Sequence, residues 1–240
     1  MERVSDPRPK PIRTRRELLK LTPVLALGAF AVPPWRESLL DRGLGFSDWL
    51  AGATFRRRHL APTFADDAAV PFERFPYNGY DVLEPDLDLE GWKLDVGGLV
   101  SRPGRYTLAQ IQALPKLRQT TRHVCVEGWD AIGRFGGASL DAFLNLVGAD
   151  PHARFVTVEC ADDYYESLDM ASARHPQTLL CYEMYERPLD RGHGAPLRLQ
   201  MPTKLGYKQA KYLTSVTVTD ALGARRSYWA DQGYSWYGGW

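Results

Sequence analysis

The sequence has few cysteines, little net charge and no long hydrophobic run, and each shortage excludes a class of protein. Its three cysteines show no CxxC or CxxCH spacing, which argues against a zinc knuckle, a thioredoxin motif and a covalently attached c-type haem. A formal net charge of +1 at pH 7 gives no large field of either sign. We therefore expect neither nucleic acid nor a polyanionic substrate as a partner.

The sequence does have the composition of an ordinary globular domain. Of its 240 residues, 44% are hydrophobic and 25% are charged, so the chain can bury one good core. The sequence contains no internal repeats, and no linker divides its globular part. We predict one domain over residues 75–240, an extended or helical lead-in over 35–74, and a separate segment over 1–34.

This first segment carries two adjacent arginines before an apolar run. Residues 14–20 read Thr-Arg-Arg-Glu-Leu-Leu-Lys, and the run covers residues 21–32. It is shorter than the roughly 20 residues of a spanning helix, and prolines interrupt and follow it. The pattern resembles a twin-arginine export signal, which implies a folded periplasmic protein, free or membrane-associated. The alternative is a basic, disordered terminus before an amphipathic helix.

Alternating apolar residues predict that strands dominate the domain. Trp92, Leu94 and Val96 alternate with polar residues before a Gly-Gly pair, as in a half-buried strand. Loops rich in Gly, Pro and Asp separate similar segments farther along. Further strands are predicted at residues 117–126, 155–159, 179–183, 197–201 and 212–219.

Short helices are predicted between these strands. Thr107 is a suitable N-cap for a helix that ends before Pro115. Ser139 is the equivalent residue of a second helix, which carries one apolar stripe and is closed by Gly148. Another short helix is expected in the lead-in. The fold class is therefore α+β, rich in strands with short helices inserted.

Four loops concentrate residue types that are costly to bury without a purpose. Basic residues next to glycine, where the backbone can approach a ligand closely, are what a phosphate-bearing cofactor requires. Any one loop alone is weak evidence, because a lone cysteine is usually an inert buried thiol and basic loops are usually solvated. The loops are PYNGYD at 76–81, RHVCVEGW at 122–129, HGAPLR at 193–198 and KLGYKQAK at 204–211.

Together and in this order, the four loops resemble the molybdopterin-binding domain of the sulfite oxidase family. The resemblance runs from about Phe75 to Trp240 and is most specific at the CVEGW sequence that begins at Cys125. The carboxyl-terminal sequence YWADQGYSWY at 228–237 also fits. It implies that family's β-rich fold and a Mo-molybdopterin cofactor.

The resemblance also implies roles for individual residues. Cys125 matches the cysteine whose thiolate binds molybdenum, and a soft thiolate suits a metal already held by the two pterin sulfurs. Arg198 and Lys211 match positions that contact the pterin or its phosphate. His193 takes a polar position of the same site, with a turn residue as the alternative interpretation. The other cofactor-binding residues it implies are Asn78, Tyr80, Asp81, Lys208 and, mainly through backbone N–H groups, Gln209 and Ala210.

The remaining cysteines allow two interpretations. Cys160 and Cys181 lie on predicted strands, and in an oxidising compartment they could pair and leave Cys125 for the metal. They could equally be separate buried thiols. Cys160 also falls near a family position that contacts the pterin, so it is included among the candidate cofactor-binding residues.

The residues after Cys125 favour a neutral substrate. Sulfite oxidases surround the metal with arginines, whereas Val126 and Glu127 follow this cysteine, and an acid beside the metal disfavours an oxyanion. The segment is more similar to exported bacterial relatives that reduce sulfoxides, including methionine sulfoxide in proteins, by oxygen-atom transfer. Glu127 or Tyr80 would assist proton transfer. Sulfite oxidation is the alternative, since Arg122 and His123 could supply positive charge.

The resemblance further implies how electrons arrive. Without a haem-binding segment or an extra dimerisation domain, we expect a monomeric catalytic subunit with a membrane haem-b or quinone-linked partner. A different class of function is an exported binding domain that kept the fold and lost the cofactor. The retained Cys125, Arg198 and Lys211 argue against it.

Overall fold

The computed structural model describes residues 34–56, 59–76, 79 and 85–240. The chain divides into two compact units, Met1–Gly43 and Leu44–Trp240. Most of the expected signal segment lies outside the described residues. Helix α2 (Pro34–Thr54) is longer than the short helix expected in the lead-in, because no proline interrupts the sequence between Pro34 and Pro62. No described helix is long and apolar enough to cross a membrane.

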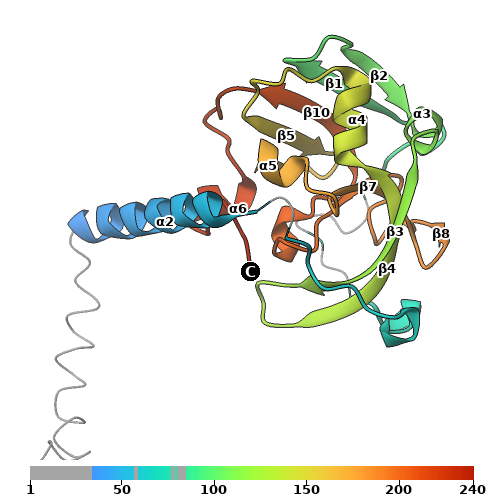
Figure 1. Ribbon diagram of the computed structural model, residues 1–240, viewed down its shortest axis with the longest axis horizontal. Coiled ribbons are helices and arrows are strands. Elements are labelled where there is room, and N and C mark those ends of the chain that lie inside the picture. The colour runs from blue at the N-terminus through green and yellow to red at the C-terminus, as the bar shows by residue number, and fades with distance from the viewer. Residues whose placement is uncertain (1–33, 57–58, 77–78, 80–84) are drawn as a thin grey trace, which may run out of the picture. The chain divides into compact units, whose positions relative to one another are not determined.

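The described part of the second unit contains two five-stranded sheets (Figure 1). One has the order β2-β1-β10-β5-β6 and is antiparallel except for the parallel pair β1–β10. The other is antiparallel and has the order β3-β4-β7-β8, with β9 also paired to β7. The strands are β1 (Lys93–Gly98), β2 (Gly104–Thr107), β3 (Lys116–Val124), β4 (Asp130–Ser139), β5 (Phe155–Cys160), β6 (Tyr165–Asp169), β7 (Leu179–Met184), β8 (Arg187–Pro188), β9 (Arg198–Gln200) and β10 (Leu213–Thr219).

Short helices connect these strands, as an α+β fold requires, and the predicted fold class is confirmed. The α-helices after α2 are α3 (Leu108–Gln112), α4 (Leu140–Val147), α5 (Met170–Ala173) and α6 (Tyr228–Asp231). The 3-10 helices are η1 (Asp66–Ala68), η2 (Phe72–Arg74) and η3 (Gly206–Lys208).

The largest hydrophobic cluster packs α4 against the β10-containing sheet. Leu94 and Val96 of β1 are buried while Lys93 and Asp95 are exposed, which confirms the predicted alternation. Full burial of one such aliphatic side chain contributes about 1.5–3 kcal/mol. The cluster also includes the apolar stripe of α4, Leu140, Phe143, Leu144 and Val147, and the strand residues Val156, Val158, Val216 and Val218.

The two predicted helix starts differ in mechanism. Thr107 caps α3 through a capping box with Gln110, as predicted. Ser139 occupies the N-cap position of α4, but its side chain makes no capping hydrogen bond. The first N–H of this helix, from Leu140, instead donates to the carbonyl of Thr178 at 3.0 Å. Gly148 ends the helix in the left-handed region with φ 65°, where glycine is favoured.

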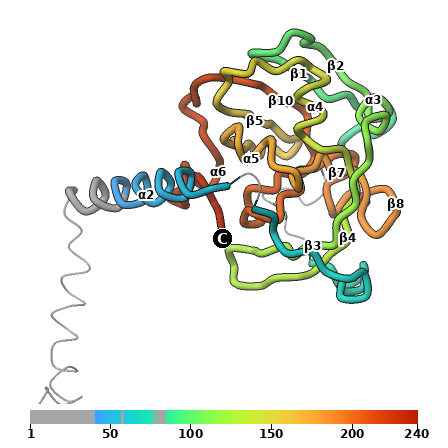
Figure 2. Tube along the Cα trace, in the orientation of Figure 1, coloured from blue at the N-terminus to red at the C-terminus, as the bar shows by residue number. Residues whose placement is uncertain are grey.

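The longest strand, β4, was not predicted because its sequence is rich in glycine, which has a low strand propensity. A Cβ atom at Gly133 would lie 2.6 Å from Cε2 of Phe75, and one at Gly137 would overlap the carbonyl oxygen of Leu180. These glycines therefore allow β4 to approach its neighbours closely. Strands β3 and β4 form a long curved hairpin (Figure 2). The short strands β2, β6 and β8 were also not predicted.

The lead-in after α2 lies along this hairpin. The Phe64 N–H donates to the carbonyl of Thr120 at 2.9 Å, and the Val70 N–H donates to the carbonyl of Ile132 at 3.0 Å. Phe75, at the end of the lead-in, is buried in a second hydrophobic cluster with Phe135 of β4. The lead-in thereby brings Phe75 to the edge of the cavity described next.

Candidate active site

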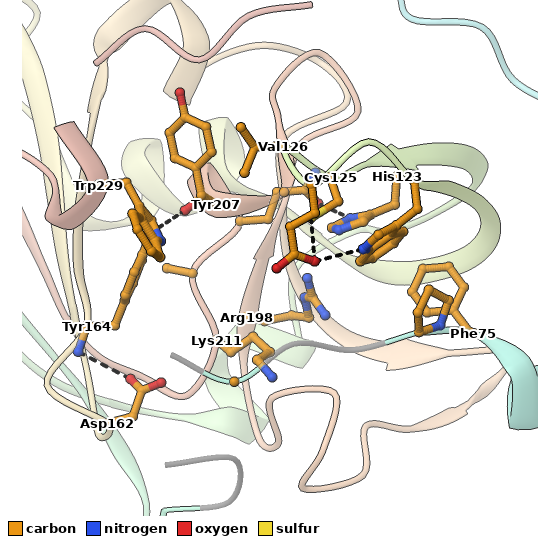
Figure 3. Close-up of a pocket in the computed structure, with 17 residues that line it drawn as sticks. Phe75, His123, Cys125, Val126, Asp162, Tyr164, Arg198, Tyr207, Lys211 and Trp229 are labelled. Carbon is orange, nitrogen blue, oxygen red and sulfur yellow. Dashed lines mark hydrogen bonds between the residues drawn. The ribbon is translucent and has the colours of Figure 1, made fainter. Parts of the chain in front are cut away.

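A cavity of about 440 Å³ forms where several loops converge (Figure 3). The turn after β3 contributes Cys125 and Glu127, and the β5–β6 loop contributes Asp162 and Tyr164. Arg198 begins β9, and the segment 209–211 precedes β10. The cavity therefore gathers residues from all four loops that the sequence singled out, with Pro76 and Gly79 contributed by the first of them.

Cys125 lies in the tight turn that joins β3 to β4. The strand was predicted to run to residue 126, but it ends at Val124, so Cys125 is the first residue of the turn. Its N–H donates to the carbonyl of Trp129 at 2.9 Å, and its carbonyl accepts from the Gly128 N–H at 3.2 Å. Gly128 has φ 93°, a backbone conformation that residues other than glycine rarely adopt. This turn presents the thiol to the cavity (Figure 3).

Glu127 is the acidic neighbour of this thiol. Its Oε2 lies 3.8 Å from Cys125 Sγ and accepts a hydrogen bond from Trp129 Nε1 at 3.0 Å. Burial, and to a smaller extent the charge of Glu127, raise the pKa of the Cys125 thiol. The thiol therefore keeps its proton at neutral pH unless a metal cation displaces it.

Two cationic side chains, Arg198 and Lys211, line the cavity and point into it in Figure 3. Arg198 is buried, and its Nη1 donates to the carbonyl of His193 at 3.0 Å. Among the described residues, no salt bridge compensates its charge, and burial lowers its pKa. Lys211 Nζ donates to the carbonyl of Gly192 at 2.9 Å. A buried guanidinium without a carboxylate is stabilised when an anion binds beside it, so this wall fits a phosphate-bearing cofactor.

Arg122 and His123 were expected to supply positive charge for sulfite, but neither places a charge in this cavity. Arg122 does not line the cavity and pairs with Asp130 at 3.5 Å. His123 does line it, but burial and the nearby Arg198 lower its pKa to about 3, so the ring is neutral. The argument that these two residues could favour sulfite is therefore wrong.

Lys208 and His193 do not line the cavity, although both belong to the predicted site. The ammonium of Lys208 is buried and donates to Glu166 Oε1 at 2.5 Å, the carbonyl of Ser167 at 2.8 Å and that of Trp236 at 2.7 Å. His193 Nδ1 lies 2.7 Å from Asp190 Oδ1. Its contribution to the site is the carbonyl that holds Arg198.

Gln209 and Ala210 line the cavity, but the N–H of Gln209 is already used. It donates to the carbonyl of Gly206 at 2.9 Å, while the side-chain oxygen accepts from His123 Nδ1 at 3.3 Å. Asn78, Tyr80 and Asp81 lie outside the described residues. The loop that contains them borders the cavity at Gly79.

The other two cysteines are free thiols on different sheets. Cys160 is buried at the end of β5 and does not line the cavity, and Cys181 is buried within β7. Of the two interpretations that the sequence allowed, the structure shows separate buried thiols.

Several cavity residues were not among the predicted site residues. Tyr207 and Trp229 belong to sequence segments that carried the family resemblance, so closer attention to those segments could have found them. Asp162 and Tyr164 lie in a hairpin loop without a recognisable signal. Burial raises the pKa of the Asp162 carboxyl, which faces the same cavity as Lys211.

The profile of a family described as "Oxidoreductase molybdopterin binding domain" matches residues 82–229. The chain belongs to this family. It is therefore an oxidoreductase, and the cavity with Cys125, Arg198 and Lys211 lies within or borders the matched region. Membership also argues against a cofactor-free binding domain.

Relatives of the chain are named for one reaction. A protein of Azospira oryzae named "Putative protein-methionine-sulfoxide reductase subunit YedZ1" is 44% identical over 205 residues, which cover 85% of this chain and 77% of that protein. The protein-methionine-sulfoxide reductase catalytic subunit MsrP of Pseudomonas syringae pv. tomato is 27% identical over 250 residues, covering 89% and 74%. MsrP of Xanthomonas axonopodis pv. citri is 27% identical over 253 residues, covering 94% and 76%.

The fold of this chain is similar to that of a solved structure. The sulfane dehydrogenase SoxCD from Paracoccus pantotrophus aligns with a TM-score of 0.54 and 20% identity. The alignment covers 58% of this chain and 41% of that one. At this identity the likeness concerns the fold alone.

Proposed function

We propose that this member of the family is a Mo-molybdopterin enzyme that reduces sulfoxides by oxygen-atom transfer. One observation carries the proposal: a single cavity holds the Cys125 thiol beside a carboxylate, and the cations Arg198 and Lys211 line the same cavity, as an anionic cofactor would require. The names of the relatives, protein-methionine-sulfoxide reductase subunits, support the choice of substrate.

The cofactor would be held at two points. The Cys125 thiolate would ligate molybdenum, and Arg198 and Lys211 would bind the phosphate group. Within the described ranges, no group of three or more His, Cys, Asp or Glu residues could hold a metal by itself, which agrees with a metal whose other ligands come from the cofactor. When bound, the cofactor would supply the two-electron redox chemistry that oxygen-atom transfer needs.

The chain contributes positioning, charge and a proton. Reduction of a sulfoxide consumes two electrons and two protons and gives a thioether and water. Glu127 is the described carboxylate nearest the Cys125 sulfur, and its hydrogen bond to Trp129 fixes its position for proton transfer. Its negative charge also raises the energy of an oxyanion such as sulfite by about 1–2 kcal/mol, whereas a neutral sulfoxide avoids this cost. Tyr80 remains a second candidate proton donor.

The electrons would come from outside the chain. We propose a membrane haem-b or quinone-linked subunit as the donor and a monomeric catalytic subunit as its acceptor. The relatives' names, which describe them as subunits, support a partner. The paired arginines before the apolar run of residues 21–32 support export to the periplasm by the twin-arginine route.

Metal analysis and sulfoxide turnover test this function on one preparation. Protein matured with its amino-terminal segment and cofactor pathway intact should contain about one molybdenum per chain and oxidise a reduced artificial donor when dimethyl sulfoxide is added. Cys125→Ser should lose the activity, because a hydroxyl is a harder and poorer ligand for this metal.

The matched control is Cys181→Ser. Cys181 is buried within β7 and does not line the cavity, and it donates to the carbonyl of Glu183 at 3.2 Å, a bond that a hydroxyl can also make. This variant should keep both metal and activity. Full activity in Cys125→Ser, or wild-type protein without molybdenum, would contradict the proposed function.

A further inference from the structure

One wall of the cavity is mainly aromatic, and the Asp162 carboxyl group lines the cavity beside it. Tyr164, Tyr207 and Trp229 line it, and Figure 3 shows them on the side away from His123 and Phe75. Val126, the residue after Cys125, lines the cavity between the thiol and these residues in the same view. A substrate at the thiol therefore has an apolar surface on one side.

Hydrogen bonds hold this wall in place. Tyr164 Oη donates to the carbonyl of Tyr207 at 2.6 Å, and Tyr207 Oη donates to the carbonyl of Ser235 at 2.7 Å. The Trp229 ring packs edge-on against Tyr234, with centroids 5.2 Å apart, and against Tyr228 at 5.3 Å. Because the rings are already ordered, a ligand that contacts them gains affinity without paying to organise them.

The wall continues to the protein surface. Tyr234 is 41% exposed and packs against both Trp229 and Tyr207. Val126 is 42% exposed. Single exposed apolar residues are ordinary, but Val126 lines the cavity that contains the Cys125 thiol, and Tyr234 contacts two rings that line it.

We propose that Trp229 and Tyr234, together with Val126, form a subsite for the non-reacting alkyl chain of the substrate. The subsite favours sulfoxides with an extended, uncharged chain, such as methionine sulfoxide within a peptide, over dimethyl sulfoxide. Alkyl groups pack favourably on aromatic rings. This inference rests on the proposed sulfoxide reduction and names the residues that select among its substrates.

The test compares two substrates on the same holoenzyme. We would measure kcat/KM for dimethyl sulfoxide and for N-acetyl-methionine-sulfoxide amide, with molybdenum content, in wild type and Trp229→Ala. The ratio of the second value to the first should fall about tenfold in the variant, mainly through KM, because the apolar contact area is lost. Activity on dimethyl sulfoxide should fall less than activity on the longer substrate, because the smaller molecule makes less contact with the ring, and Trp229→Phe should lie between wild type and Trp229→Ala.

Two further variants keep the test sharp. Tyr234→Ala alters an exposed side chain, so it should fold even if Trp229→Ala does not, and it should lower the same ratio about threefold. Trp49→Ala is the matched control, because Trp49 is 64% exposed on α2 and does not line the cavity. It should leave the ratio unchanged.

The outcomes separate this inference from the function on which it rests. If wild type reduces neither sulfoxide, the proposed function fails and the subsite fails with it. If wild type reduces both but Trp229→Ala and Tyr234→Ala leave the ratio unchanged, only the subsite is wrong. A loss of molybdenum that accounts for the whole loss of activity would instead assign Trp229 to cofactor binding and overturn the subsite.

Discussion

Glu127 Oε2 lies 3.8 Å from the sulfur of Cys125, so a substrate approaching a metal on this thiolate also approaches a carboxylate. Replacing Glu127 with Gln removes the negative charge and keeps the side-chain length. We expect kcat/KM for sulfite to rise about tenfold over wild type, because the Coulomb cost of an anion disappears. The value for dimethyl sulfoxide should fall, because the proposed proton donor is lost, so the ratio of the two rises further.

The comparison needs one metal-replete preparation of each variant and both assay directions. Glu90→Gln, an exposed residue away from the cavity, should leave the ratio unchanged. If sulfite is the far better substrate of the wild type and Glu127→Gln does not change its rate, the carboxylate does not face the substrate.

Arg198 should matter more for holding the cofactor than for folding. In Arg198→Met the methionine fills much of the space and removes a buried charge that has no salt bridge within the described residues. We expect molybdenum content after gel filtration to fall at least about tenfold, with the midpoint of thermal unfolding of the cofactor-free protein nearly unchanged. Arg154→Met, outside the cavity, is the control. Full retention of the cofactor in Arg198→Met would show that the phosphate lies elsewhere.

The buried ion pair between Lys208 and Glu166 should be strongly coupled. Both residues are 1% exposed, and their charged atoms are 2.5 Å apart. Lys208→Met or Glu166→Gln alone leaves one charge buried and should lower the free energy of unfolding by about 3–5 kcal/mol. The double variant should lose less than the sum of the two. Urea unfolding of the four proteins measures this coupling, and strictly additive losses would contradict it.

Lys204 should make stability rise with pH above neutrality. Burial lowers its pKa from 10.5 to about 7, and its Nζ donates to the carbonyl of Tyr237 at 2.9 Å. Between these two values the unfolded chain binds a proton at Lys204 that the folded protein lacks. Raising the pH therefore favours the folded state by up to about 1.4 kcal/mol per pH unit, and below pH 7 the penalty is fully present.

Urea unfolding at pH 7, 8 and 9 tests this sign. The difference between wild type and Lys204→Met isolates the Lys204 contribution, because other titrating groups are shared. We expect wild type to gain stability relative to Lys204→Met as the pH rises. Parallel curves would show that Lys204 stays protonated, held by the Tyr237 ring whose centroid is 3.0 Å from Nζ.

Local patterns predicted the elements whose signals are local. Thr107 and Gly148 mark a helix start and a helix end through their own backbone chemistry, and the alternation at Leu94 and Val96 reflects one buried face. Strand β4 was not predicted, because the reason for its glycines is close contact with Phe75 and Leu180, which are distant in sequence.

In the candidate site, too, local sequence signals predicted some features and contacts between distant residues determined the others. Cys125 and Arg198 could be placed because short motifs surround them, and both line the cavity. Lys208 belongs to such a motif, yet its ammonium turns toward Glu166, and no sequence pattern reveals that direction. Sequence therefore indicated which loops converge better than which side chains face the cavity.

Backbone carbonyl groups of residues 235–238 accept hydrogen bonds from the loop at 204–211, which lines the cavity. The carbonyl of Ser235 accepts from Tyr207, that of Trp236 from Lys208, and that of Gly238 from the N–H of Leu205 at 2.8 Å. Ribosomes make residues 235–238 after the loop at 204–211, so the loop first emerges without these acceptors. A nascent chain halted before residue 235 would carry the side chains of the 204–211 loop but not the carbonyl groups that bind them, so the cavity is complete only once residue 238 has been made.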